Sequence, residues 1–388
     1  MNKKLKIGIV CYPSIGGSGI VASELGQELA KLGHQAHFIS YEPPFRLNLK
    51  SKNIFFHQVK LNEYTLFKYP DYTLPLSVKI VEVSQKHGLD ILHAHYAVPH
   101  ATAGLLAKDI ANKEKIRFPH LITTLHGTDI TLLAHDKSLM PVIDYSLEYS
   151  CGVTAVSRAL KQDTLDVLDL DVPIEVIHNF YNPRKITKTK SAVRRSLKIK
   201  DSDFVAIHLS NLRPVKRIPD LLKITAQLKR QANFKMLILA GGSFSPFKPL
   251  VKKLGIGPRL VVKEDVLDIE NYIYASNVGV YTSKEESFGM GVLETMAYGK
   301  PVLATRVGGI PEFMQDKKTG FLFKLGDVKG FAKKLRELSQ NPDLTFALGQ
   351  NAAAQAASGF TGKIIVQKYL AYYYKIIKTC QGKFPKKH

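Results

Sequence analysis

Residues 286–294 read ESFGMGVLE, with a glutamate at each end and a glycine-containing turn between them. The apolar run before this stretch ends at Val280 and Tyr281, which predicts that the turn follows a strand and opens an amphipathic helix. Ligands of open α/β sheets bind at the carboxyl ends of strands, and the free N–H groups of a helix start suit a phosphate. We expect Glu294 about two turns inside the helix, on the face that carries Glu286. The two carboxylates can then accept hydrogen bonds from the hydroxyl groups of a sugar and a ribose. The alternative is that they are only solvated acids near a helix N-terminus, where acidic residues are favoured.

The composition is that of a globular protein with more than one core. The chain has 388 residues, of which 45% are hydrophobic and 23% charged, and this length favours two domains. No apolar run approaches the ~18 residues that span a bilayer. Cys11, Cys151 and Cys380 have neither metal-like nor disulfide-like spacing, so we expect unpaired thiols and a cytoplasmic protein.

The positive charge lies almost entirely in the second half. Residues 1–185 hold 20 Lys and Arg against 18 Asp and Glu, a net +2, whereas residues 186–388 hold 35 against 15, a net +20. Such a half attracts nucleotides, nucleic acids or anionic membranes, or simply improves solubility. No nucleic-acid-binding signature accompanies it, so we expect neither a nucleic-acid partner nor membrane insertion, and a homo-oligomer stays open.

Short apolar strands alternate with amphipathic helices twice along the chain, which predicts an α/β fold with two doubly wound, Rossmann-like domains. The first domain is expected over residues 1–182 and the second over 204–360. Residues 183–203 carry many basic residues and are interpreted as a solvated linker with one short helix. A ligand cleft between the domains is the default expectation.

Several motifs allow more than one reading. Gly17-x-Gly19-x-x-Ala22 fits a dinucleotide fingerprint, but residues 11–15 intervene between the first strand and the glycine run, so a phosphate or carboxylate is favoured over a dehydrogenase cofactor. His93, His95 and His100 suggest a metal, yet no acidic or thiol partner pattern accompanies them. The Asp-x-Asp motifs at 169–171 and 201–203 fall in loops away from strand ends and are interpreted as incidental. Arg213 and Lys216 follow the first strand of the second domain, where they can meet a diphosphate.

Together these residues resemble the family-4 retaining glycosyltransferases of GT-B fold, in which two Rossmann-like domains face a central cleft. The resemblance rests on the 286–294 stretch, Lys216, and the segments 308–312 and 320–322, and it covers nearly the whole chain. In the first domain, residues 11–19, 44–48, 67–70, 93–100 and 123–131 resemble the members that transfer N-acetylglucosamine (GlcNAc) from UDP-GlcNAc to L-malate in bacillithiol biosynthesis. The family also implies that the last helix, residues 361–380, returns to the first domain.

The resemblance implies a role for each site residue and requires no metal or other cofactor. His126, Lys216 and Glu286 are the implied catalytic residues, with Lys216 neutralising the leaving diphosphate and His126 contacting the sugar 6-hydroxyl. The implied donor-binding residues are Gly16, Gly17, Asn211, Arg213, Lys216, Glu286, Ser287, Phe288, Gly289 and Glu294. Ser18, Arg46, Tyr96 and Thr124 are the candidates for binding the acceptor.

Two departures from the family pattern concern the donor side. Many relatives have an arginine at the position of Asn211, and Arg213 is expected to replace that charge. The turn at residues 241–244 differs from the usual Gly-Asp-Gly-Pro, so the uracil-side loop is expected to differ as well. A lipid or glycan acceptor at the membrane and a non-catalytic nucleotide-sugar binder are the competing hypotheses.

Overall fold

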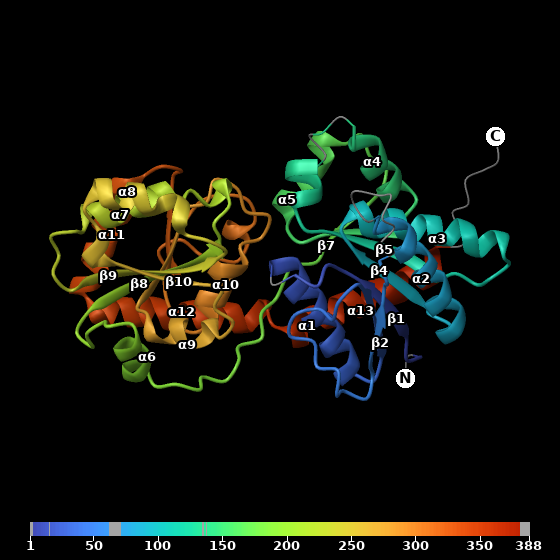
Figure 1. The fold of residues 1–388 in the computed structure, drawn as a ribbon, viewed down its shortest axis with the longest axis horizontal. Coiled ribbons are helices and arrows are strands. Elements are labelled where there is room, and N and C mark those ends of the chain that lie inside the picture. The colour runs from blue at the N-terminus through green and yellow to red at the C-terminus, as the bar shows by residue number, and fades with distance from the viewer. Residues whose placement is uncertain (1–2, 15, 62–70, 134–135, 137, 381–388) are drawn as a thin grey trace. The chain divides into compact units, whose positions relative to one another are not determined.

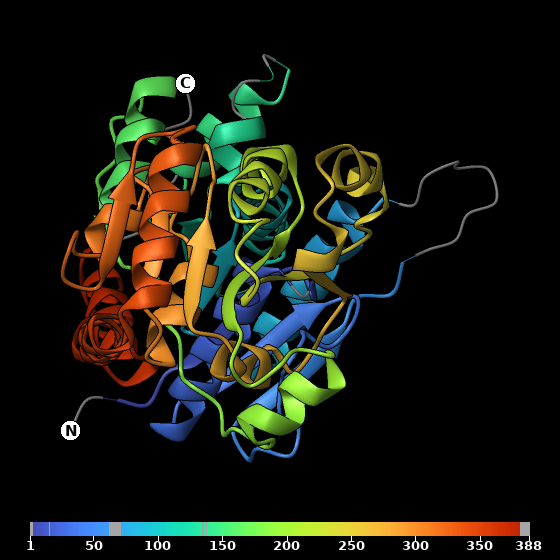
Figure 2. The same ribbon diagram turned by 90° about the vertical axis from the view of Figure 1, so that its left-hand side faces the viewer.

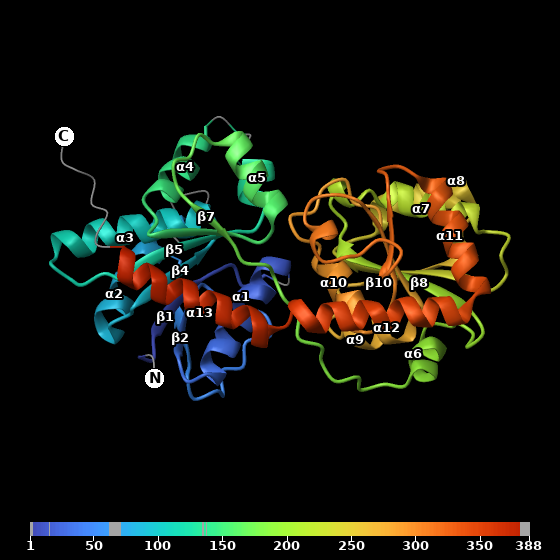
Figure 3. The same cartoon turned by 180° about the vertical axis from the view of Figure 1, so that it is seen from behind.

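The computed structural model of the chain describes residues 3–14, 16–61, 71–133, 136 and 138–380, drawn in Figures 1–3. The chain forms two compact units: unit 1 comprises Met1–Asn179 and Gly362–His388, and unit 2 comprises Phe180–Thr361. Each unit contains one parallel sheet with helices on both faces, which confirms the predicted α/β class with two doubly wound domains.

The sheet of unit 1 has seven parallel strands in the order β3-β2-β1-β4-β5-β6-β7. Its strands are short and mostly buried, as expected for a parallel sheet covered on both faces. They are β1 Lys6–Val10, β2 Gln35–Ser40, β3 Ile54–Gln58, β4 Ile91–His95, β5 His120–Leu125, β6 Gly152–Ala155 and β7 Ile174–Val176.

Helices cover both faces of this sheet. They are α1 Gly17–Lys31, α2 Thr73–His87, α3 Thr102–Lys113, α4 Met140–Glu148, α5 Arg158–Val167 and α13 Gly362–Thr379. Leu92 and Ala94 of β4 join the apolar core that includes α2 and α3, whereas His93 points to Tyr373 of α13, as strand alternation requires. The last helix of the chain therefore packs within unit 1, where it also contacts α1 (Figure 3).

The sheet of unit 2 has six parallel strands in the order β10-β9-β8-β11-β12-β13. They are β8 Phe204–Asn211, β9 Phe234–Gly241, β10 Leu260–Glu264, β11 Val278–Tyr281, β12 Val302–Thr305 and β13 Gly320–Phe323. The helices on its two faces, which are turned toward the viewer in Figure 2, are α6 Lys190–Ser196, α7 Ile218–Gln227, α8 Lys248–Leu254, α9 Ile269–Ala275, α10 Met290–Ala297, α11 Val328–Gln340 and α12 Pro342–Gly359.

The interpretation of residues 183–203 as a solvated basic linker is wrong at its centre. Helix α6 packs against α9, and the Arg194 side chain is buried, with 1% of its surface exposed. Its guanidinium donates to the carbonyl oxygens of Ala275, Asp201 and Asp203 and to the Asn277 side chain, at 2.8–2.9 Å. These acceptors compensate for the desolvated charge, so the segment is part of unit 2.

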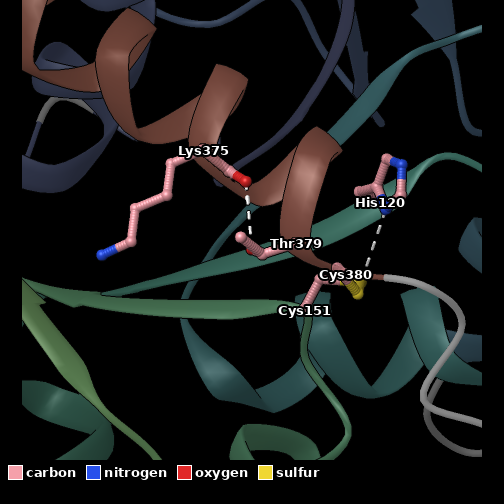
Figure 4. The surroundings of a disulfide bond; sticks show 5 residues. All are labelled: His120, Cys151, Lys375, Thr379 and Cys380. Atoms are coloured by element: carbon pink, nitrogen blue, oxygen red, sulfur yellow. Dashed lines mark hydrogen bonds between the residues drawn. A yellow bond between two sulfur atoms is a disulfide. The ribbon is translucent and has the colours of Figure 1, made fainter.

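The expectation of three unpaired thiols is wrong for two of them. Cys151 precedes β6 and Cys380 follows α13, and the two form a disulfide with their Cα atoms 5.7 Å apart (Figure 4). The residues are 229 positions apart in sequence, so only the packing of α13 on unit 1 brings them together. Cys11 is a buried free thiol.

Within the described residues, no helix combines the length and apolar character that crossing a membrane requires.

Candidate functional site

In unit 2, an ion pair lies at the carboxyl ends of β8 and β11. Lys216 ends a short 3-10 turn after β8, and its Nζ lies 2.7 Å from Oε1 of Glu286 in the turn after β11. The Ser283 hydroxyl donates to the same Oε1 at 2.7 Å. The Lys216 and Glu286 side chains keep only 15% and 11% of their surface exposed. Both of these contacts engage Oε1 of Glu286.

The backbone holds these two turns together. Thr282 donates its hydroxyl to the Lys216 carbonyl at 3.1 Å, and the Lys284 N–H donates to Val215 at 2.7 Å. On the other side, the Glu286 carbonyl accepts from the Gly309 N–H at 3.0 Å. Gly308, with φ of +49°, permits this approach, because a Cβ there would lie 1.8 Å from the Glu286 oxygen. The 308–312 motif thus fixes the position of Glu286.

Helix α10 begins later than expected. It starts at Met290, after Gly289 with φ of +101°, so Glu294 is the fifth helical residue and Glu286 precedes the helix. The expectation that both glutamates share a helix face two turns apart is therefore wrong, because the glycine turn separates them. The Glu294 side chain is buried within unit 2. Burial raises the pKa of Tyr181 and Tyr281, and the negative charge of Glu294 adds to both shifts.

The other predicted donor-binding residues divide into backbone and surface positions. The Phe288 ring is buried against Phe313 and Phe360, so only its backbone can meet a ligand. Ser287 is half-buried beside it. Asn211 and Arg213 are exposed at the end of β8, where the Arg213 N–H donates to the Asn211 carbonyl.

The divergent turn at residues 241–244 is tied to the end of β10. The Gly242 N–H donates to Asp265 at 2.8 Å, and the Phe244 N–H donates to Glu264 at 2.7 Å. A cavity of about 600 Å³ lies between α8 and β10, lined by residues that include Phe244, Leu260 and Glu264. It has no lining residue in common with the Lys216–Glu286 pair, so we do not assign the ion-pair site to it.

In unit 1, the start of α1 is tied to the segment after β4. Gly16 is extended and precedes the helix, Gly17 is the first helical residue, and Ser18 Oγ accepts from the Tyr96 hydroxyl at 2.8 Å. Tyr96 has a φ of +93°, which is uncommon for a residue with a side chain. The structure therefore brings together two of the predicted acceptor residues.

Histidines of β4 and of the segments that follow β4 and β5 form a polar network next to Tyr96. His126 Nε2 lies 2.8 Å from His95 Nδ1, and the His126 ring lies 5.2 Å from the Tyr96 ring between centroids. Burial lowers the pKa of His126 to about 3, that of His93 to about 3 and that of His100 to about 4. These imidazoles are neutral near pH 7, so His126 suits a hydrogen bond through Nδ1 better than a charge contact.

Thr124 does not reach an open position. Its side chain is fully buried, and its hydroxyl lies 2.6 Å from both His93 Nε2 and Thr154 Oγ1. The prediction that Thr124 contacts the acceptor directly is therefore corrected. The Thr124 hydroxyl instead contacts His93 and Thr154 within the histidine network.

Arg46 lies in the loop that follows β2, and it has a φ of +69°. The carbonyl of the preceding Phe45 accepts from the Ser23 hydroxyl of α1 at 3.0 Å. This bond places the Arg46 loop beside α1, the helix that carries Ser18. Ile15 and the motif at residues 67–70 lie outside the described residues.

Sequence reasoning did not identify three supporting residues. Ser283 orients Glu286, His95 orients His126, and Tyr373 lies 2.8 Å from His93 Nδ1 across 280 positions of sequence. Strand alternation puts His93 and His95 on the same face of β4, which is the sequence signal that could have indicated the role of His95. Among the described residues, His93, His95 and His100 do not form a cluster with metal-binding geometry.

Comparisons with known proteins place the chain among glycosyltransferases. Residues 15–185 match the Glycosyltransferase Family 4 model, and residues 189–355 match the Glycosyl transferases group 1 model. The chain is 40% identical over 377 residues to the N-acetyl-alpha-D-glucosaminyl L-malate synthase of Bacillus anthracis, and the aligned region covers 97% of this chain and 98% of that protein. It is also 26% identical to an uncharacterized glycosyltransferase of Methanocaldococcus jannaschii, over 90% of this chain and 92% of that protein.

Solved structures have the same fold at low sequence identity. Sucrose-phosphate synthase from Thermosynechococcus elongatus matches with a TM-score of 0.78 and 19% identity, over 97% of this chain and all of that chain. Anabaena HepE in complex with UDP-glucose matches with a TM-score of 0.77 and 21% identity, over 96% of this chain and all of that chain. These likenesses confirm the GT-B fold.

Proposed function

Since the chain belongs to family 4 of the glycosyltransferases, we propose that it transfers GlcNAc from UDP-GlcNAc to the hydroxyl of L-malate, with retention at the anomeric carbon. The observation that carries this proposal is the 40% identity to a GlcNAc–malate synthase over 97% of the chain, which includes both units. The reaction is the bacillithiol step that the sequence resemblance implies.

The ion pair of unit 2 supports a donor role. Lys216 is held in place by Glu286, so its charge is ordered before the substrate arrives and costs little reorganisation when it meets the diphosphate. Glu286 Oε2 accepts a sugar hydroxyl, and Glu294 accepts the ribose hydroxyls. Asn211, Arg213, Ser287, and the backbone N–H groups of Phe288 and Gly289 complete the donor contacts that unit 2 offers.

The leaving group needs no metal ion in this proposal. A UDP leaving group develops negative charge on its β-phosphate as the glycosidic bond breaks. The Lys216 ammonium and the N–H groups at the start of α10 stabilise such a charge directly. This is the basis for proposing that neither a metal nor another cofactor takes part in the transfer.

In the transfer step, the bond between the sugar C1 and the β-phosphate oxygen breaks while the malate hydroxyl oxygen bonds to C1 on the same face. The hydroxyl proton passes to the leaving phosphate oxygen, so atoms and charge balance. On the acceptor side, Arg46 pairs with a malate carboxylate and Ser18 donates a hydrogen bond to malate, while Tyr96, whose hydroxyl donates to Ser18, holds that serine in place. His126, neutral and oriented by His95, bonds the sugar 6-hydroxyl.

Product analysis tests this proposal. The protein is incubated with UDP-GlcNAc and L-malate, and the product is examined by mass spectrometry and proton NMR. We expect GlcNAc-malate with the α configuration of the donor. A product with the β configuration would overturn retention. A glycosylated lipid or glycan in place of GlcNAc-malate would move the acceptor to the competing hypothesis.

A further inference from the structure

Three histidines of unit 1 gather away from the residues assigned to transfer. His37 lies in β2, His57 lies in β3, and His87 is the last residue of α2. One ring nitrogen from each lies within 4.8 Å of the other two. We propose that His37, His57 and His87 form a binding site for one divalent transition-metal ion of the Zn²⁺ class.

This cluster lies on the opposite face of the sheet from the His93 network. His37 pairs in register with Gly8 of β1, and Gly8 pairs with Leu92 of β4, so the three share one face. Leu92 belongs to the core beneath α2 and α3, whereas the next residue, His93, faces α13. Metal binding at His37 is therefore separable from the transfer reaction.

The distances suit a tripod of imidazole ligands. His37 Nδ1 lies 3.0 Å from His57 Nε2, and the centroid of the His87 ring lies 4.6 Å from that of His37 and 5.0 Å from that of His57. Two nitrogens on one tetrahedral Zn²⁺, each about 2.0–2.1 Å from the ion, are about 3.4 Å apart. Small rotations of the rings are enough to bring all three onto one ion.

A neighbouring amide orients the buried ligand. His37 Nε2 lies 3.4 Å from Oε1 of Gln35, which accepts the Nε2 proton and leaves the Nδ1 lone pair directed toward His57. Metal-bound histidines characteristically donate their second N–H to such an acceptor. His37 is fully buried while His57 and His87 are half-buried, so an ion can enter from solvent and keep a water as its fourth ligand.

The protonation state of the cluster also favours ligation. Burial lowers the pKa of His37 to about 3 and that of His57 to about 4, and it also lowers the pKa of His87. All three imidazoles are neutral at pH 7, which is the form that binds a metal. The charged neighbours are Lys6, Lys79, Lys86 and Glu82, and the three lysines weaken the attraction for a cation.

The described residues contain one other cluster of this type, His120 with Cys151 and Cys380. Its two thiols form the disulfide shown in Figure 4, so they offer no thiolate to a metal while the bond is intact. The three-histidine cluster is therefore the stronger candidate.

Titration of the full-length, chelator-treated protein with Co²⁺ and Zn²⁺ tests the proposal. Co²⁺ reports the ligand geometry by its visible absorption, and calorimetry with Zn²⁺ gives stoichiometry and affinity. We expect one equivalent bound with a tetrahedral Co²⁺ spectrum, and loss of that equivalent in His57→Gln and His87→Gln. His178→Gln, outside the cluster, should bind as the parent does. Equal binding by His57→Gln and the parent, or no binding by the parent, would overturn the site.

Two further variants separate ligation from a purely structural role. Gln35→Leu should weaken binding about tenfold, because it removes the acceptor that orients His37. Lys86→Gln should strengthen binding, because it removes a positive charge near His57 and His87. A structural role for the histidines predicts no change in metal affinity in either variant, and that result would also overturn the proposal.

Discussion

The candidate residues of the two units differ in how they handle charge. In unit 2, Lys216 and Glu286 form an ion pair at 2.7 Å. In unit 1, the residues around Tyr96 and His126 are mostly hydroxyls and neutral imidazoles in a hydrogen-bonded network. Eleven of the 13 histidines lie in residues 1–179, whereas His208 is the single histidine of residues 180–361.

This difference corresponds to two chemical tasks. A departing diphosphate develops charge, and a fixed cation stabilises such a charge strongly in a partly desolvated site. Sugar hydroxyls are neutral and are bound by neutral hydrogen-bond donors and acceptors. The loss of one such hydrogen bond costs about 1 kcal/mol of binding free energy. The comparison therefore predicts large losses from substitutions at the unit 2 ion pair and smaller ones in the unit 1 network.

Replacement of Lys216 is expected to have the largest effect. Lys216→Ala should lower kcat about 10²–10³-fold, the usual cost of removing one preorganised group that stabilises transition-state charge. The exposed Lys284 of the neighbouring turn provides the matched control, and Lys284→Ala should keep near-parent turnover. Steady-state assays of both variants, with circular dichroism to verify folding, make the measurement. Near-normal turnover of Lys216→Ala would remove the leaving-group role.

The disulfide lies within unit 1, and its removal should have the second-largest effect, a decrease in the free energy of unfolding. Cys151→Ser should lower the free energy of unfolding by about 2–4 kcal/mol, because the bond to Cys380 fastens the end of α13 and restricts the unfolded chain. Urea unfolding followed by circular dichroism measures the change. Adding a reductant should destabilise the parent and leave Cys151→Ser unaffected; a parent insensitive to reductant would contradict this prediction.

If His126 acts as a neutral hydrogen-bonding group, its removal should cause a modest loss of activity, and a neutral substitute should restore most of that activity. His126→Ala should lower kcat/KM about fivefold, which corresponds to the value of about 1 kcal/mol for one neutral hydrogen bond. His126→Asn keeps a neutral donor and should recover most of the activity. If the asparagine variant is as impaired as the alanine variant, the hydrogen-bond role is wrong and the comparison between the units weakens.

The smallest effect concerns the pH dependence of stability. Burial lowers the pKa of His93 to about 3 in the folded state, whereas an unfolded histidine titrates near its usual value of about 6.5. Between these values the unfolded chain binds more protons, so the free energy of unfolding falls as the pH falls from about 6.5 toward about 3. His93→Gln should make that slope shallower by about 1 kcal/mol per pH unit. Urea titrations near pH 6 and pH 5 measure it, and an unchanged slope would contradict the assigned protonation state.

The architecture could largely be predicted from the sequence because apolar runs and helical periodicity are local signals. The strand at Val278–Tyr281 and the turn after it lie where the pattern indicated. The helix start is different, since Gly289 adopts a positive φ and delays the helix to Met290. Helix propensity alone does not distinguish a helix that starts before Gly289 from one that starts at Met290.

Long-range partners account for what could not be predicted. Cys151 and Cys380 meet only because α13 returns to unit 1, and Arg194 is buried because the carbonyl oxygens of three separate residues converge on it. The motif around Thr124 predicts a site residue, yet the position of Thr124 in β5 directs its side chain toward His93. The three-histidine cluster likewise joins residues from three elements with no common spacing.

The most direct test of the central claim is UDP release from UDP-GlcNAc by the purified protein, compared with L-malate, D-malate and no acceptor. The account predicts rapid release that depends on L-malate, with little release in the other two reactions. Release that is equally fast without malate, or that does not distinguish the two enantiomers, would contradict L-malate as the acceptor.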